Sequence, residues 1–478
     1  MTDLGVLPLW ALLIHLAIEL ALIARVLLKP YRDPAARLAW LVVLIALPVA
    51  GILVYLLLGE TSIGRRYTQR MHAVLAQLPA AGSITPTHVA DARATHLFEM
   101  ASSINGFGPC GGNTFEFPDG ADATIDALVA DIDAAQRHVH LLFYIWLTDR
   151  NGLRVVSAIE RAAARGVTCR VMVDAVGSRA LIKSQYWAAM RKAGAHTAVA
   201  LAVGNPALHV FVGRVDLRNH RKIVVIDNEI TYAGSQNCAD AAFAIKAKYA
   251  PWVDAVIRLA GPIARQNQYL FVADWMTYAG EDCRDCLNEP VPTGRGDIVA
   301  QAIGTGPTGR YSAAPELICA LLYAARTQLT VTTPYFVPDD ALLLALCSAA
   351  YRGIEVRMVF PARNDSRIVA AASRSYYQEL LDAGVRIFEY EPGLLHAKTL
   401  TVDDDLTLIG STNLDRRSFD LNYENNVLLQ SRGVTAAIRA RQARFIEASH
   451  AVTLAELSAT WAPRRAWRNA LAMLGPVL

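Results

Sequence analysis

Hydrophobic and polar residues follow distinct patterns in different parts of this chain of 478 residues. Two apolar runs of 21 residues each, 4–24 and 38–58, lie near the N-terminus and are separated by a basic connection. At about 1.5 Å of rise per residue, a helix of that length crosses the roughly 30 Å core of a bilayer. Trp40 and Tyr55 lie near the ends of the second run, where aromatic rings favour the membrane interface. The pattern predicts a hairpin of two transmembrane helices within residues 1–60.

The pattern changes after the apolar runs. Residues 61–105 are polar and rich in alanine, with weak helical periodicity, and indicate a connector. Beyond them, short β-rich apolar runs alternate with amphipathic helical stretches, which favours an α/β fold. The order strand, helix, strand occurs twice, first at 138–144, 153–165 and 168–174 and then at 329–334, 340–352 and 354–360. We therefore predict two similar α/β lobes, 106–290 and 291–478, related by a pseudo-two-fold axis.

Each predicted lobe contains one copy of a matching motif. His220-Arg221-Lys222, with Asp227 after four more residues, is repeated as His396-Ala397-Lys398 with Asp403. A Gly-Ser-x-Asn sequence follows each copy at the same interval and supplies two further pairs of polar residues, Ser235 with Asn237 and Ser411 with Asn413. Two half-sites of this kind, brought face to face, predict one composite site around a single phosphate.

The residue types in the motif suit phosphodiester chemistry. Each motif begins a strand, so that the histidine and the lysine two positions later share one side of it. A neutral imidazole can attack phosphorus and form a phosphohistidine, while a protonated imidazole gives its proton to the leaving alkoxide. We expect Lys222, Lys398 and the polar residues of the two Gly-Ser-x-Asn sequences to bind the non-bridging oxygens.

Four carboxylates accompany the motifs, and we expect two different roles for them. Asp254 lies 34 residues after His220, and Glu424 lies 28 residues after His396. Both are candidates to orient a histidine, and the uneven spacing makes Asp254 the weaker assignment. Asp227 and Asp403, although part of the catalytic motif, lie at strand ends and are expected to brace the lobes. The sequence shows no carboxylate cluster for a metal, and we expect no cofactor.

Charge and cysteine content narrow the range of partners. The formal net charge is only +3, whereas proteins that bind nucleic acid present a strongly basic surface. Cys283 and Cys286 form a C-x-x-C sequence, but no second pair of ligands stands at a suitable spacing for zinc. Nucleic acid and zinc are therefore not expected, and the oligomeric state is left open.

The paired H-x-K-x4-D motif resembles the hallmark of the phospholipase D superfamily. Within it, the chain is similar to the bacterial cardiolipin synthase family. Four more stretches are typical of that family, namely Arg32-Asp33-Pro34-Ala35-Ala36, Leu47-Pro48-Val49-Ala50-Gly51, Thr333-Pro334-Tyr335-Phe336-Val337-Pro338 and Asn413-Leu414-Asp415-Arg416-Arg417-Ser418. The resemblance covers essentially the whole chain and implies phospholipase D-like lobes with mixed central sheets flanked by helices.

The resemblance implies that a phosphatidyl group passes between two phosphatidylglycerol molecules, which yields cardiolipin and glycerol. It implies His220 as the nucleophile and His396 as the general acid and then base, although the pseudosymmetry also allows the reverse. It further implies a multi-pass protein of the bacterial cytoplasmic membrane that works on an anionic bilayer. The alternative is a hydrolytic phospholipase D or another phosphatidyltransferase of the superfamily. Arginines flank both apolar runs, so the positive-inside rule does not decide which membrane face carries the lobes.

The C-terminal residues 461–478 interleave Trp461, Trp467 and aliphatic residues with arginines. Such a pattern is typical of an amphipathic helix at a lipid surface. A terminal helix packed on the second lobe accounts for it equally well, and both alternatives stay open at this point.

Overall fold

The computed structural model describes residues 8–60, 64–83, 92–202, 214, 216–291, 294–459 and 461–472. The chain divides into two compact units. The N-terminal unit is formed mainly by residues 1–68, and the large unit by residues 69–202 and 218–476. Each unit is described by itself below.

Three helices form the N-terminal unit, α1 (Leu9–Leu28), α2 (Pro34–Ala46) and α3 (Pro48–Leu58). Val26, Trp40, Leu44 and Tyr55 are buried between them, and the rings of Trp40 and Tyr55 meet edge to face. Most other aliphatic side chains of these helices are exposed. Among the described residues, α1 is the one helix whose length and composition would allow it to cross a membrane.

The prediction of a second continuous transmembrane helix was wrong, because residues 38–58 are divided between α2 and α3. Leu47, between the two helices, has φ −129° and ψ 71°, outside the helical region. The ring of Pro48 disfavours a helical conformation at the preceding residue, and Pro48 has no N–H to continue the hydrogen-bond ladder. With 13 and 11 residues, each helix is shorter than the about 20 residues that a bilayer core requires.

The large unit is built on one mixed sheet of 16 strands. The strands of its first half, together with the short paired strand β8, are β1 (Cys110–Glu116), β2 (His138–Phe143), β3 (Thr168–Asp174), β4 (His196–Ala200), β5 (Arg218–Asn219), β6 (Ile223–Ile226), β7 (Ile230–Gly234), β8 (Trp252–Val253) and β9 (Val256–Ala260). Those of the second half, with the short strands β12, β15 and β18, are β10 (Ile298–Thr305), β11 (Gln328–Thr332), β12 (Phe336–Val337), β13 (Glu355–Pro361), β14 (Arg386–Tyr390), β15 (Leu394–Leu395), β16 (Thr399–Val402), β17 (Leu406–Gly410), β18 (Leu414–Asp415), β19 (Asn422–Gln430) and β20 (Ser449–Ala451).

The strand order shows the internal repeat. β1 and β10 pair antiparallel in the middle of the sheet. From β1 outward the order is β9-β7-β6-β2-β3-β4, and from β10 outward it is β19-β17-β16-β11-β13-β14. The prediction of two similar halves is confirmed, although they share one continuous sheet where a sheet in each lobe was expected. The six strands and helices expected from the sequence are all present, with ends that differ by at most three residues.

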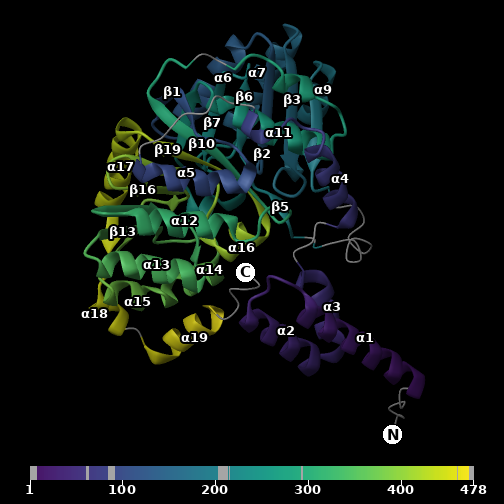
Figure 1. The fold of residues 1–478 in the computed structure, drawn as a ribbon, viewed down its shortest axis with the longest axis vertical. Helices are drawn as coiled ribbons and strands as arrows, with labels where there is room; N and C mark the ends of the chain where they lie inside the picture. The colour runs from purple at the N-terminus through teal and green to yellow at the C-terminus, as the bar shows by residue number, and fades with distance from the viewer. Residues whose placement is uncertain are drawn as a thin grey trace. The chain divides into compact units, whose positions relative to one another are not determined.

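Helices cover both faces of this sheet (Figure 1). The helices of the first half are α6 (Ala121–Ala134), α7 (Arg150–Ala164), α8 (Arg179–Ile182), α9 (Gln185–Lys192), η2 (Ala244–Tyr249), α11 (Ile263–Tyr278) and η3 (Arg284–Leu287). Those of the second half are α12 (Ala313–Ala324), α13 (Asp340–Tyr351), α14 (Arg367–Ser375), α15 (Tyr377–Asp382), α16 (Arg416–Asp420), α17 (Arg432–Glu447), α18 (Leu454–Ser458) and α19 (Ala462–Ala472). One core cluster contains residues of α11 and α17 and strands of both halves, which joins the halves into one body.

The expected connector and the C-terminal segment both contribute helices. The connector contains α4 (Arg65–Leu75), η1 (Ala81–Ser83) and α5 (Ala92–Asn105). α5 packs against β10 and α12 and belongs to the core of the second half. α19 packs against α14 and buries Leu471, so the C-terminal helix is docked on the second half, while Trp461 and Trp467 remain exposed.

Candidate active site

Two short parallel strand pairs cross between the halves and place the motif histidines. β5, directly before His220, pairs with the start of β19, which carries Glu424. β15, directly before His396, pairs with β8, which leads into Asp254. The backbone N–H of His220 donates to the carbonyl of Tyr423 at 2.9 Å, and that of His396 to the carbonyl of Val253 at 2.8 Å. Each histidine therefore lies against a strand of the opposite half.

Each histidine contacts the carboxylate of the opposite half. His220 Nδ1 lies 2.9 Å from both carboxylate oxygens of Glu424, and His396 Nδ1 lies 2.6 Å from Asp254 Oδ1. An ionised carboxylate only accepts hydrogen bonds, so Nδ1 carries the hydrogen and Nε2 keeps the lone pair in a neutral ring. Both orienting candidates contact a histidine, but the pairing is crosswise. Neither carboxylate serves the motif that precedes it in its own half.

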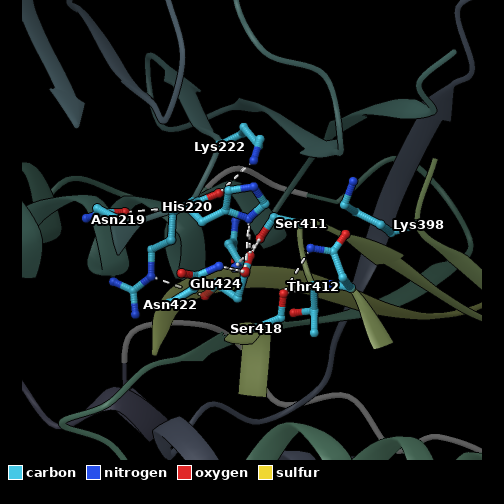
Figure 2. A network of polar contacts seen from close by, with 12 residues as sticks. Asn219, His220, Lys222, Lys398, Ser411, Thr412, Ser418, Asn422 and Glu424 are labelled. Atoms are coloured by element: carbon cyan, nitrogen blue, oxygen red, sulfur yellow. Dashed lines mark hydrogen bonds and ion pairs between the residues drawn. The ribbon is translucent and has the colours of Figure 1, made fainter. Parts of the chain in front are cut away.

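The two motif serines hold these carboxylates in place. Ser235 Oγ donates to Asp254 Oδ1 at 2.7 Å, and Ser411 Oγ donates to Glu424 Oε2. Glu424 also accepts from Asn422 Nδ2 at 3.1 Å, and Figure 2 shows Ser411 and Asn422 beside the carboxylate that faces His220. We expected the serines to bind phosphate, whereas their hydroxyls are used within the protein. The Gly-Ser sequence thus completes a Ser–carboxylate–His series in each half-site.

The two lysines are buried and symmetrically placed. Lys222 Nζ donates to the carbonyl of His220 at 2.8 Å, and Lys398 Nζ donates to that of His396 at 2.6 Å. Each lysine borders a small cavity: the one at Lys398 is lined mainly by aliphatic residues, and the one at Lys222 by a mixture of apolar and polar residues. Burial lowers the pKa of Lys222 to about 8 and that of Lys398 to about 7. Both ammonium groups therefore have pKa values close to physiological pH, which makes their charge sensitive to an anion in the site.

Burial also controls the charge on the histidines. It lowers the pKa of His220 to about 4, with Lys222 and Lys398 acting in the same direction and Glu424 opposing. It lowers the pKa of His396 to about 4 as well, where both lysines again add to the effect and Asp254 opposes it. Because each histidine responds to the lysines of both halves, the four side chains form one site. With pKa values of about 4, both rings are neutral at pH 7.

The orienting carboxylates remain ionised in spite of their burial. Burial by itself would raise the pKa of Asp254, but His396, Lys398 and Ser235 outweigh it and lower the pKa to about 2. The pKa of Glu424 is likewise lowered, because His220, Lys222 and Ser411 outweigh the effect of burial. Each half-site thus keeps an acceptor for the Nδ1–H of its histidine.

The motif asparagines are also partly used within the protein. Asn237 Oδ1 accepts from the backbone N–H of Ile145 at 3.2 Å, and Asn413 Nδ2 donates to Ser418 Oγ at 3.0 Å. In the described part of the chain, the buried Oδ1 atoms of Asn413 and Asn422 have no hydrogen-bond partner. These two oxygens are free to accept hydrogen bonds from a hydroxyl group.

The motif aspartates brace the sheet. Asp227 accepts hydrogen bonds at 2.8 Å from three backbone N–H groups at the start of β2, those of Gln136, Arg137 and His138. Asp403 accepts from the corresponding N–H groups at the start of β11, those of Arg326, Thr327 and Gln328, and also from the Arg93 side chain. Each aspartate follows the end of the strand that its lysine precedes, so it lies at the opposite end of that strand from the lysine. Their contacts are structural ones.

Sequence reasoning missed a buried ion pair beside His220. Arg221 Nη1 donates to Asp274 Oδ1 at 2.8 Å, and the same guanidinium donates to the carbonyls of Glu424 and Thr305, each at 3.2 Å. Asn219 Nδ2 donates to the other oxygen of Asp274 at 3.0 Å. Asp274 is the only acidic residue of α11, a helix buried along nearly its whole length, and that isolation was the available signal.

Aromatic rings and a third carboxylate complete the surroundings. The ring of Tyr144 lies 4.9 Å from that of His220, and the ring of Trp252 lies 4.7 Å from that of His396. Burial raises the pKa of Asp415 to about 6, although the N–H of Ser418 donates to it at 2.7 Å. Within the described ranges, no group of three or more His, Cys, Asp or Glu residues has the arrangement of a metal site.

Comparison with known proteins agrees with this geometry. The family described as "Cardiolipin synthase, PLD-like domain" matches residues 128–270 and 318–446, and "Phospholipase D-nuclease N-terminal" matches residues 18–60. The fold is similar to that of phosphatidylserine synthase from Haemophilus influenzae, with a TM-score of 0.59, 14% identity, and coverage of 76% of this chain and 95% of that one. The fold and the paired motifs thus define a phospholipase D-like protein.

Sequence comparison narrows this class. The chain is 37% identical to cardiolipin synthase A of Edwardsiella ictaluri over 462 residues, which cover 94% of this chain and 93% of the relative. It is also 37% identical to cardiolipin synthase A of Serratia proteamaculans, with coverage of 93% and 92%. The chain therefore belongs to the cardiolipin synthase family of the phospholipase D superfamily.

Proposed function

We propose that this protein transfers a phosphatidyl group from one phosphatidylglycerol to a hydroxyl group of a second one, which gives cardiolipin and glycerol. The proposal rests on the pair of crosswise Ser–carboxylate–His series and on the two buried lysines, each of which influences both histidines. Such a site offers two Nε2 atoms, one to attack phosphorus and one to exchange a proton with the alcohol, and membership of the cardiolipin synthase family supports the lipid substrate.

In the first proposed step, His220 Nε2 attacks phosphorus and the bond from phosphorus to the headgroup glycerol oxygen breaks. His396 Nε2–H gives its proton to that oxygen, so glycerol leaves neutral. The low pKa of free His396 rises when the anionic phosphodiester binds, because a nearby negative charge stabilises the imidazolium form. Family resemblance supports His220 as the nucleophile.

In the second step, the hydroxyl of another phosphatidylglycerol gives its proton to His396 and attacks phosphorus. The bond between phosphorus and His220 breaks, and a new phosphodiester forms. Lys222 and Lys398 stabilise the negative charge on the non-bridging oxygens in both steps. The unpartnered Oδ1 atoms of Asn413 and Asn422 suit hydroxyl hydrogens of a glycerol headgroup.

The proposal includes a site of action at the bacterial cytoplasmic membrane. The length and apolar composition of α1 support an anchor there, as do the exposed aliphatic side chains of α2 and α3. In the proposed multi-pass arrangement, α2 and α3 cross together as one segment broken at Leu47. An anionic bilayer containing phosphatidylglycerol is the proposed partner.

Product analysis by mass spectrometry tests the proposal. Purified full-length protein is incubated with phosphatidylglycerol vesicles in the presence of EDTA, and we expect cardiolipin and glycerol in equal amounts. His220→Ala and His396→Ala should abolish both products, while His96→Ala, at a side chain 87% exposed in α5, should leave them unchanged. Phosphatidic acid as the sole lipid product would mean that water is the acceptor, and the protein would then be a phospholipase.

A further inference from the structure

The two halves differ in length beside the active site. Asp254 comes 17 residues after Asn237, whereas Glu424 comes only 11 residues after Asn413. The longer segment contains η2 (Ala244–Tyr249), a turn of six residues. The uneven spacing of the two carboxylates therefore arises from extra chain in the first half, directly before the residue that orients His396.

The extra segment presents apolar and basic side chains to solvent. Residues 244–248 are exposed, and Ile245 is 60% exposed. Lys246 and Lys248 are its charged residues, and residues 241–251 include no acidic one. Lys248 forms no ion pair with any residue that the structure describes, and its Nζ lies 5.9 Å from the ring centre of Tyr249. The segment therefore places one aliphatic side chain between two cations on the surface, a combination that suits contact with an anionic lipid surface.

Contacts tie this segment to the active site. The ring of Phe243 stacks on that of Trp252 with centroids 3.9 Å apart, and Trp252 in turn lies 4.7 Å from His396. Lys246 forms an ion pair with Asp365 of the second half. Asp365 also accepts a hydrogen bond at 2.7 Å from Tyr335, which follows β11. The segment is therefore held at the boundary of the two halves, next to the catalytic histidine.

The second half adds similar side chains at the same place. Asp365 lies two residues before α14, whose first turn exposes Arg367 and Ile368. Arg363, four residues before the helix, is also exposed. α19 packs on α14, as Figure 1 shows. Trp461, directly before α19, and Trp467, within it, are exposed. We call the five residues Ile245, Lys248, Arg363, Arg367 and Ile368 the rim surface.

We propose that the rim surface rests on the anionic lipid surface and presents phosphatidylglycerol to the active site. This inference builds on the proposed function, since it names the surface through which that substrate arrives. Basic residues close to an anionic membrane attract it, and aliphatic and aromatic side chains enter the headgroup region. The rim surface combines three cations with two separate aliphatic side chains, whereas a protein-docking patch is more often contiguous and apolar. The pairing of Lys246 with Asp365 keeps the two parts together.

A fluorescence experiment on the full-length protein measures contact between the rim surface and lipid independently of catalysis. Ile245→Cys carries an environment-sensitive label, in a Cys286→Ser, Cys319→Ser background, because those two thiols are the partly exposed ones among seven. The control is Leu344→Cys in α13, which replaces an aliphatic residue of similar exposure, 64%. In vesicles that contain brominated phosphatidylglycerol, we expect the label at 245 to be quenched and the label at 344 to keep its emission.

Equal quenching at both positions, or none at 245, would overturn the proposal. Self-quenching between labelled copies, with no quenching by lipid, would overturn it too and would indicate an interface between copies. If the wild-type protein makes no product from phosphatidylglycerol but the label at 245 is quenched, the proposed function fails while the lipid contact stands.

Kinetics in mixed micelles then test the link to substrate. For Ile245→Asp, which adds one negative charge, we expect the mole fraction of phosphatidylglycerol at half-maximal rate to rise about fivefold, the effect of one unit of charge near an anionic surface. For Lys248→Glu, which changes the charge by two units, the rise should be larger. The maximal rate should stay within about twofold, since neither residue belongs to the catalytic groups. Leu344→Asp is the matched control. A lower maximal rate with unchanged half-saturation would contradict the proposal and point to a structural role through Trp252 and His396.

Discussion

The two halves of the large unit use the same parts but differ where those parts meet the substrate. Each half supplies a histidine, a lysine, a serine and a carboxylate, and the hydrogen bonds of one half-site match those of the other. Beyond this set the symmetry ends. His220 has the Arg221–Asp274 ion pair beside it, whereas Ala397 takes the position of Arg221 next to His396.

Further differences separate the halves in the same region. Glu424 accepts from Asn422 as well as from Ser411, whereas Asp254 is preceded by Trp252, whose ring lies against His396. Asp415, buried close to Lys398, corresponds to Ala239 in the first half. In the proposed reaction the symmetric residues exchange protons and bind phosphate. A difference in task between the two histidines should therefore come from the residues that differ between the halves.

Replacement of each orienting carboxylate by its amide should give the largest effects. It should also distinguish the nucleophilic histidine from the one that acts as general acid and base. We expect Glu424→Gln and Asp254→Asn each to lower kcat for phosphatidylglycerol by about 10⁴-fold, because loss of the carboxylate leaves a histidine without the acceptor that fixes its tautomer. With a phosphatidyl p-nitrophenyl ester, whose leaving group needs no general acid, Asp254→Asn should still release a burst of p-nitrophenol. Glu424→Gln should not. A burst from Glu424→Gln but not from Asp254→Asn would show that His396 is the nucleophile and His220 the general acid and base.

Removal of the ion pair found in only one half should mainly affect stability. Arg221→Ala leaves the buried Asp274 carboxylate without its cation, and we expect a loss of about 3–5 kcal/mol in the free energy of unfolding. Replacing both partners, as Arg221→Met with Asp274→Leu, should recover most of that loss, because no uncompensated charge remains. Thermal unfolding of the full-length protein measures both. Arg258→Ala, which breaks an ion pair in the first half that is nearer the surface, is the control and should cost clearly less.

The two serines should show a smaller and unequal effect. Hydrogen bonds to charged groups contribute about 1.5–3 kcal/mol, so removal of either hydroxyl should reduce kcat by about 10- to 100-fold. We expect Ser235→Ala to be the more damaging change, because Glu424 keeps Asn422 as a donor when Ser411 is replaced. Steady-state rates on phosphatidylglycerol are the measurement, with the ratio of the two variants as the informative quantity. Equal losses would show that Asn422 contributes nothing to holding Glu424.

The pH dependence of kcat/KM should report whether Lys222 and Lys398 are charged. A lysine with a lowered pKa is an ammonium below that pKa and a neutral amine above it, so kcat/KM should decline as pH rises through about 7 to 8. A bound phosphodiester stabilises the ammonium form, so the decline of kcat at saturating substrate should lie at higher pH. Lys398→Arg keeps its charge throughout this range. In an active Lys398→Arg variant, the decline of kcat/KM that remains should report the titration of Lys222. If kcat/KM of the wild-type protein declines only at pH 10 and above, the assignment to the lysines is wrong.

Much of the fold could be predicted from the sequence, because the same order of strands and helices occurs in both halves. The order of strands and helices and the matching motifs all follow from local pattern, and local pattern is what hydrophobic periodicity reports. The break after Leu47 was also visible as Pro48, although membrane helices tolerate proline often enough to make a continuous helix a reasonable expectation.

The sequence could not show which groups meet across the boundary between the halves. The number of residues between His220 and Asp254 gives no information on the pairing, because the partner of each histidine comes from the other half through β5 and β8. The serines were assigned to the substrate for the same reason, since their carboxylate partners are brought to them only by the folded sheet. Asp274 lay outside every motif, in the second half of α11, where the other buried residues are mainly apolar or aromatic.

The crosswise pairing also has a consequence for the ancestry of the site. A single half carries one histidine and one carboxylate that do not serve each other, so it could work only as two identical chains arranged about a true two-fold axis. Fusing two such copies turns a bimolecular assembly into an intramolecular one, with an effective concentration that no longer depends on how much protein the cell makes. Once both copies lie in one chain, each can mutate separately, and this allows Arg221, Asp415 and η2 to exist on one side only.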